Sequence, residues 1–322
     1  VSVSVGFADK RGRTFVAVGE RRNDCERYNE QISLLCNIKG AEYLQAATEA
    51  AHVLIRPVFR VHPAPDPPRY DQLAKTIKYI ARHHKLDPAV WHWRWRGDDA
   101  EGESLADYLE RLPRDGDARG VYLAIQRQAL LINNRSLFDG APGLHHGVGA
   151  AIYARFSSPM REVVGIFTHK EALEGLAGID DAPEDEAIHA AVILAANRSK
   201  QTQRKVTKQS NQLVLDEFLA ADVALPLAER PAHPGVIIGA ENGKLYVQLE
   251  SPPLEVKVYL PLVARCLDAR ADTRGRGKGA LERGDERVAW YLGDTLSLTV
   301  HHQEANGHWC LVPDRVLSWV EP

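Results

Sequence analysis

The run HHGVGAAIYARFSSPMR at residues 145–161 joins a small-residue segment to a Ser-Ser-Pro-x-Arg sequence. Ser158 before Pro159 predicts a helix start, because serine caps helices and proline suits the first helical position, where no amide donor is needed. Arg161 then falls in the first turn, where a cation opposes the helix dipole, so we interpret it as part of an anion site. The Ser157 hydroxyl and free first-turn amides would complete a phosphodiester site. On spacing alone, an ordinary capped helix with a surface arginine remains open.

This run resembles the signature of the RNB domain of ribonuclease II and RNase R, roughly His-Phe-Gly-Leu, then Tyr, then Thr-Ser-Pro-Ile-Arg-Arg-Tyr and a later His-Arg. Two further segments agree in order with that family. RYNEQISLLCN at residues 27–37 resembles its Arg-x-x-Glu-Glu-x-Met-x-x-Ala-Asn helix, and FRVH at residues 59–62 resembles its Tyr-Arg-Val-His. In the first run the matching residues are His145, Gly147, Tyr153, Ser157, Ser158, Pro159, Met160 and Arg161, followed by His169 and Lys170.

The resemblance implies a 3′-to-5′ exoribonuclease that hydrolyses single-stranded RNA to 5′-mononucleotides, with Mg²⁺ held by aspartates. In two-metal phosphoryl chemistry the ions activate water, and an arginine steadies the reacting phosphate. Arg161 matches that catalytic arginine. Glu30 matches an acid that touches ribose hydroxyls, although its neighbour Gln31 departs from the family pattern. The resemblance also implies RNA-binding roles for Asn37, His145, Tyr153, Ser157 and Ser158.

The family's aspartate-rich motif is expected before the Glu30 helix, and residues 1–29 do not contain it. We therefore expect the Mg²⁺ ligands in a segment upstream of this chain and predict no metal ligand within it. The acidic run at residues 179–185 is interpreted as an exposed loop. After Arg161, the residues Glu162, Val163 and Gly165 depart from the family pattern. A non-catalytic RNA-binding relative is the alternative to an enzyme, and a protein-binding adaptor is a third possibility.

The pattern of elements predicts an α+β protein with two domains. Residues 1–225 are expected to form an RNB-type domain, a mixed sheet with packed helices. Residues 233–322 carry short strand patterns in the number that a five-stranded OB-type RNA-binding barrel needs. The expected elements begin with a hairpin in residues 1–20 and a helix from Glu30 with Ile32, Leu35, Ile38, Ala41 and Leu44 buried. Helices are expected at 70–83, 104–111 and 120–132, followed by a strand at 146–156. Two further helices are expected to end at about Leu173 and Ala220.

The net charge of −3, from 40 basic and 43 acidic residues, places any nucleic-acid site in local clusters. RSKQTQRKVTK is one such run, and its Arg204 and Lys205 are candidates for phosphate contact, although most such runs are solvated helix faces. WHWRWR at residues 91–96 is interpreted as a strand with one buried aromatic face, with an RNA-stacking strip as the alternative.

The four cysteines, Cys25, Cys36, Cys266 and Cys310, show no short paired spacing. This argues against a zinc module and a disulfide framework. Likewise, the pairs His145-His146 and His301-His302 are expected to be packing or loop residues. No apolar run approaches the roughly 20 residues that span a bilayer. We expect a cytoplasmic, monomeric protein whose partner is single-stranded RNA and not a membrane.

Overall fold

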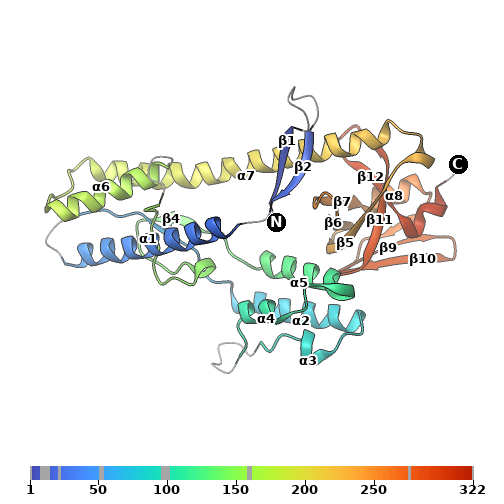
Figure 1. The fold of residues 1–322 in the computed structure, drawn as a ribbon, viewed down its shortest axis with the longest axis horizontal. Coiled ribbons are helices and arrows are strands. Elements are labelled where there is room, and N and C mark those ends of the chain that lie inside the picture. The colour runs from blue at the N-terminus through green and yellow to red at the C-terminus, as the bar shows by residue number, and fades with distance from the viewer. Residues whose placement is uncertain are drawn as a thin grey trace. The chain divides into compact units, whose positions relative to one another are not determined.

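The computed structural model describes residues 2–7, 15–20, 23–50, 54–95, 102–157, 162–274 and 277–320. Helices and antiparallel strands alternate along the chain (Figure 1), so the predicted α+β class is confirmed. The chain divides into two compact units. Unit 1 comprises residues 1–20, 66–132 and 211–322, and unit 2 comprises residues 21–65 and 133–210. The predicted division into residues 1–225 and 233–322 stays a prediction.

Unit 2 is built from helices around a short antiparallel ladder. Its elements are α1 (Asp24–Glu49), β3 (Phe59–Val61), β4 (Leu137–Asp139), a 3-10 turn (His146–Val148), α6 (Val163–Ala177) and the first part of α7 (Asp185–Val223). A reciprocal capping box between Asn23 and Glu26 fixes the start of α1. Ala41 and Leu44 of α1 pack with Ile55, Phe59, Ile152 and Ala154 in one core cluster.

Three local predictions in unit 2 are wrong. Ile32 and Leu35 of α1 are 66% and 59% exposed, so the buried stripe covers only the second half of this helix. Residues 146–156 form a 3-10 turn and isolated bridges instead of a strand. Helix α6 starts at Val163, because the extended backbone of Glu162 precedes it. The predicted helix from Pro159 to Leu173 is therefore interrupted at Glu162, and the place of Arg161 in a first turn lies outside the described residues.

In unit 1, short helices pack on β-sheets around one large core. The hairpin of β1 (Ser2–Phe7) and β2 (Phe15–Glu20) is confirmed. The expected helices are confirmed as α2 (Pro67–His83), α4 (Leu105–Arg111) and α5 (Arg119–Leu131), with α3 (Pro88–Trp91) in addition. Trp91 and Trp93 are buried, but Trp91 ends α3 and no described residue of 91–95 is in a strand, so the strand prediction is wrong.

The strands after residue 231 form two antiparallel sheets. The first has the order β12-β11-β5-β6-β7 and the second β10-β9-β8. Their bounds are β5 (Ala232–Glu241), β6 (Lys244–Leu249), β7 (Glu255–Tyr259), β8 (Arg270–Asp272), β9 (Lys278–Arg283), β10 (Glu286–Tyr291), β11 (Thr295–Gln303) and β12 (Trp309–Pro313).

Helix α8 (Leu260–Cys266) follows β7 directly, and Pro261 is suited to its first turn. Five strands share one sheet, as an OB-type barrel requires. Among the described residues, however, β12 and β7 are the unpaired edges of that sheet, so the predicted closed barrel is not confirmed. No described helix is long and apolar enough to cross a bilayer.

Candidate nucleic-acid interface

Asn37 of α1 anchors the loop that leads into the Ser-Ser-Pro-x-Arg segment. Its Nδ2 donates to the Tyr153 hydroxyl at 2.7 Å and to Ser157 Oγ at 3.0 Å. Its Oδ1 accepts from the backbone amides of Phe156 and Ser157, both at 2.8 Å. Two donors and two lone pairs are the full capacity of an asparagine side chain. Asn37 therefore positions this loop, and a direct contact with RNA stays a prediction.

The loop is also fixed by close backbone packing. The Arg60 amide of β3 donates to Tyr153 O at 2.8 Å, and Phe59 forms a bridge with Ala154. A Cβ on Gly40 of α1 would lie 2.2 Å from the Phe156 ring, so only glycine allows this approach of loop and helix. The loop ends at a defined place, with Ser157 held beside the start of the undescribed residues 158–161.

His145 lies beneath this loop and is 5% exposed. Its ring is 4.9 Å from the Tyr153 ring and 5.3 Å from the His62 ring, between centroids. Burial, reinforced by the charge of Arg60, lowers the pKa of His145 to about 4. At neutral pH the imidazole is therefore uncharged. It cannot act as a cation for phosphate, and an RNA contact by His145 stays a prediction.

A cavity of about 620 Å³ lies beside the loop within unit 2. Its charged lining consists of three cations, Arg60, Arg155 and Lys200, and one carboxylate, Glu162, which leaves two net positive charges. Arg155 and Glu162 form a bidentate ion pair, with Nε–Oε2 at 3.0 Å and Nη2–Oε1 at 2.7 Å. The remaining excess of positive charge favours an anionic ligand.

Lys200 and Arg60 are held together in this cavity by Ser136. The Lys200 ammonium donates to Ser136 O at 2.6 Å and to its Oγ at 2.9 Å, and Arg60 Nη2 donates to the same Oγ at 3.3 Å. Burial, with the charges of Arg60 and Arg204, lowers the pKa of Lys200 to about 8. Burial also lowers the pKa of Arg60, whose Nε has no hydrogen-bond partner among the described residues. The nearby carboxylate, Glu162, is already paired with Arg155, so Arg60 and Lys200 keep the excess of positive charge that favours a phosphate.

The other predicted site residues are placed as follows. Glu30 is exposed on α1, seven residues before Asn37, so it lies on the same helix face about 10 Å away along the axis. Arg204 and Lys205 are exposed on α7, and the Arg204 charge acts on Lys200. Ser158 and Arg161 lie outside the described residues. The structure thus brings Asn37, His145, Tyr153 and Ser157 together, with the cation-lined cavity beside them.

The residues described in unit 2 do not fit a Mg²⁺ site. Their one group of close carboxylates is Glu171, Glu174 and Asp181, in which Lys170 already lies where a cation would bind. The Lys170 ammonium is 3.2 Å from Glu171, 2.6 Å from Glu174 and 3.5 Å from Asp181. The predicted loop is present before α7 and is largely exposed, but the Asp181 side chain is buried and also paired with Arg56 at 2.9 Å. This cluster is an internal ion-pair network.

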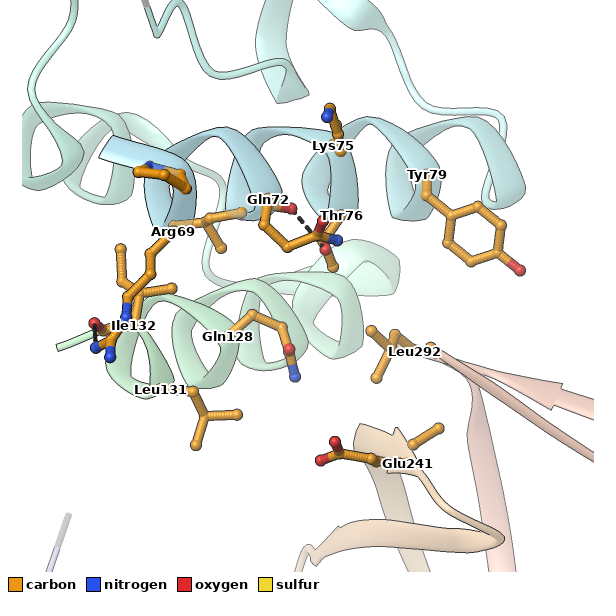
Figure 2. A pocket seen from close by; sticks show the side chains of 14 residues that line it. Arg69, Gln72, Lys75, Thr76, Tyr79, Gln128, Leu131, Ile132, Glu241 and Leu292 are labelled. Carbon is orange, nitrogen blue, oxygen red and sulfur yellow. Dashed lines mark hydrogen bonds between the residues drawn. The ribbon is translucent and has the colours of Figure 1, made fainter. Parts of the chain in front are cut away.

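Unit 1 has a separate cavity of about 570 Å³ between α2, α5 and the first strand of the five-stranded sheet. Figure 2 shows Arg69, Lys75 and Tyr79 on α2, with Gln128 of α5 and Glu241 of β5 across from them. Arg69 reaches α5, where its Nη1 donates to Ile132 O at 3.1 Å. Its charged lining, Arg69, Lys75 and Glu241, has one net positive charge, compared with two in the cavity beside the Asn37-anchored loop.

Comparisons with known proteins agree with this geometry. Ribonuclease R from Escherichia coli (strain K12) is 25% identical over 150 residues, which is 47% of this chain and 16% of that protein. The mouse exosome complex exonuclease RRP44 is 29% identical over 144 residues, 44% of this chain and 13% of that protein. No protein-family model matches the chain. The chain thus aligns with less than a fifth of the length of these relatives.

Solved structures show the same fold. Mycoplasma genitalium RNase R in complex with ribose-methylated single-stranded RNA superposes with a TM-score of 0.74 at 12% identity, covering 97% of this chain and 45% of that one. Yeast Ssd1, described as a pseudonuclease, gives a TM-score of 0.59 at 13% identity, with 88% and 30% covered. The chain is therefore an α+β protein with the ribonuclease R fold. Its sequence is similar to those of ribonuclease R and RRP44 over somewhat less than half of its length.

Sequence reasoning missed Arg60 and Arg155 as site residues. Arg60 stood in the FRVH segment that matches the family, so the signal was present but was used only to establish the resemblance. Arg155 had no comparable signal. Its place in the cavity depends on the ion pair with Glu162, a residue that the sequence indicated only as a departure from the family pattern.

Proposed function

We propose that the protein binds single-stranded RNA along unit 2 and takes part in its 3′-to-5′ exonucleolytic hydrolysis to 5′-mononucleotides. The observation that carries this proposal is the cation-lined cavity beside the Asn37-anchored loop. Arg60 and Lys200 supply charge for a phosphate, and the ordered backbone near Ser157 supplies a fixed position for it. An RNA strand gains affinity from such contacts through release of its counterions.

In this proposal Arg161 acts on the reacting phosphate, because it follows Ser157 closely in the chain and precedes Glu162 of the cavity lining. Glu30 is proposed to contact ribose hydroxyls, and Arg204 and Lys205 to guide the strand along α7. Mg²⁺ remains part of the proposal from the family resemblance alone, with its ligands expected upstream. We derive no catalytic step through the ion.

The second candidate is a non-catalytic RNA-binding member of the family. Two observations favour it: Lys170 fills the carboxylate cluster of unit 2, and the fold is shared with a protein described as a pseudonuclease. RNA binding by the cavity is common to both candidates. Only hydrolysis separates them.

The experiment uses RNA labelled with a fluorophore at either the 3′ or the 5′ end, incubated with Mg²⁺ or with EDTA. It is run on this chain and on the chain together with any sequence that its coding region places before Val1. Stepwise Mg²⁺-dependent shortening from the 3′ end by the longer protein supports the exoribonuclease. Binding without shortening by both proteins supports the non-catalytic relative.

A matched pair of variants tests whether the cavity is the RNA site. Lys200→Met removes the buried ammonium, whereas Lys208→Met removes an exposed one from the same helix. We expect the first to weaken RNA binding by about tenfold, in line with a lost charge-assisted hydrogen bond, and the second by about twofold or less. Equal effects would contradict the assignment of the cavity.

A further inference from the structure

Two cysteines and two histidines meet in unit 1, far from the cavity residues in sequence. They are Cys266, His301, His302 and Cys310, and their ligand atoms all lie within 4.8 Å of one another. Cys266 Sγ and Cys310 Sγ are 3.0 Å apart, and the two histidine Nδ1 atoms are 2.8 Å apart. Sequence spacing gave no sign of this group, because 35 residues separate Cys266 from His301.

Three features of the fold bring the four side chains together. Cys266 is the last residue of α8, which returns toward the sheet after β7. Cys310 lies on β12 directly opposite His302 in the antiparallel register. A β-bulge between Val300 and His302 then inserts His301 as an extra residue. Neighbouring strand residues normally point to opposite faces, and a bulge is the irregularity that turns two of them to the same side.

The spacing suits a tetrahedral zinc ion. Zinc–sulfur bonds of about 2.3 Å and zinc–nitrogen bonds of about 2.0–2.1 Å place tetrahedral ligand atoms about 3.3–3.8 Å apart. The measured separations, from 2.8 to at most 4.8 Å, bracket that range. The sulfur atoms are well beyond the bonded distance of about 2.05 Å in a disulfide, and both cysteines are free.

Surrounding groups fit the same interpretation. His302 Nε2 lies 3.5 Å from Glu304 Oε1, which leaves Nδ1 of that ring directed to the cluster. Arg265 Nη2 holds the same carboxylate oxygen at 3.3 Å. A carboxylate on the outer nitrogen of a histidine is the usual support for a metal ligand. Cys310 is fully buried, and two thiolates with one Zn²⁺ would leave no net charge to bury.

We propose that Cys266, His301, His302 and Cys310 bind one structural Zn²⁺ ion that ties α8 to β11 and β12. On binding, the two thiols release their protons to solvent, and both imidazoles coordinate as neutral rings. All four positions are filled by side chains, so no position is left open for water or substrate, and the ion has a structural role. This site is independent of the Mg²⁺ expected for RNA hydrolysis.

The first test is metal analysis of the full chain, purified without an affinity tag that binds metal and without added metal. We expect one zinc per chain by elemental analysis, released when a mercurial blocks the thiols. Co²⁺ added to the metal-free chain should produce the thiolate-to-cobalt charge-transfer band and the strong visible bands of a tetrahedral site. Absence of zinc together with absence of these bands would overturn the proposal.

Variants locate the metal. Cys266→Ser and His302→Ala should each abolish the cobalt bands, while Cys25→Ser and Cys36→Ser, which change the two exposed cysteines, should leave them unchanged. Glu304→Gln keeps all four ligands, so it serves if a ligand variant does not fold. This substitution should lower the affinity for the metal by about 10–100-fold. A Cys266–Cys310 disulfide in freshly purified, unreduced protein, or loss of metal in Cys25→Ser or Cys36→Ser, would contradict this assignment.

Discussion

Asn37 and Ser157, 120 residues apart in the chain, are joined by two hydrogen bonds: Asn37 Nδ2 donates to Ser157 Oγ at 3.0 Å, and the Ser157 amide donates to Asn37 Oδ1 at 2.8 Å. Both residues belong to segments that match the family. The structure gives a physical reason for pairing them, because the asparagine fixes the residue that leads into the Ser-Pro-x-Arg segment. The Asn37 side chain orders the site, so it can affect RNA binding without contacting RNA.

Replacing Asn37 by alanine should therefore destabilise unit 2 and weaken RNA binding together. The loop amides of Phe156 and Ser157 lose their acceptor, and unsatisfied buried groups cost about 1–3 kcal/mol each. We expect a loss of about 2–4 kcal/mol in unfolding free energy, measured by urea titration. Asn133→Ala, at an exposed position of the same unit, should stay within about 0.5 kcal/mol of the parent. An unchanged stability for Asn37→Ala would refute the anchoring role.

Arg161→Ala separates chemistry from binding in the catalytically competent protein. One arginine at the reacting phosphate stabilises the transition state, whereas many groups hold the strand, so kcat should fall by about 10²–10³-fold. Affinity for RNA should change by about threefold or less. Single-turnover shortening of end-labelled RNA and equilibrium binding measure the two quantities, with Arg198→Ala on the exposed face of α7 as control. Equal losses in rate and affinity would contradict a role of Arg161 at the reacting phosphate.

The local elements were largely predictable from sequence, because periodicity and breakers are local signals. The hairpin, helices α2, α4, α5 and α7, and most strands after residue 231 lie where the pattern places them. The family resemblance assigned Asn37, Tyr153 and Ser157 to RNA binding without information on the hydrogen bonds that join them. The start of α6 at Val163 did not follow, because Glu162 bonds Arg155 and stays extended, and no local pattern predicts such a tertiary contact.

Other features depend on packing that no local pattern encodes. The exposed positions of Ile32 and Leu35 share the helical spacing of buried Leu44, so spacing alone cannot separate them. The Cys266 and Cys310 sulfurs meet only because α8 folds back on the sheet. Lys200 looked like part of a solvated basic run, and only the structure reveals that it is half-buried against Ser136.

The lowered pKa of Lys200 predicts a pH dependence of RNA binding. Its ammonium loses the proton as pH rises through about 8, so affinity should fall between pH 7 and pH 9. Stability should respond in the opposite sense. Because the unfolded lysine titrates near 10.5, the unfolded chain binds more protons between about pH 8 and 10.5, and this residue makes stability rise with pH there.

The variant Lys200→Arg keeps its charge across this range and should flatten the pH dependence of RNA affinity. Lys208→Arg, at an exposed position on the same helix, should keep the slope of the parent. Fluorescence anisotropy with a non-hydrolysable RNA at fixed ionic strength measures both. A slope that is identical in the parent and in Lys200→Arg would exclude Lys200 as its source.

Glu162→Gln should strengthen RNA binding, which is an unusual direction for a substitution in a binding site. Glu162 accepts two hydrogen bonds from Arg155 and is the only carboxylate among the described lining residues of the cavity. Its neutralisation raises the net charge of the lining from two to three positive charges and leaves Arg155 available to phosphate. We expect an affinity gain of about 3–10-fold at low salt and a slope of log affinity against log salt that is steeper by about 0.7.

The control variant Glu42→Gln removes an exposed carboxylate paired with Lys39 and should leave both quantities unchanged. If Glu162→Gln instead weakens binding, the ion pair with Arg155 is required to shape the cavity, and phosphate must be held by Arg60 and Lys200 without it.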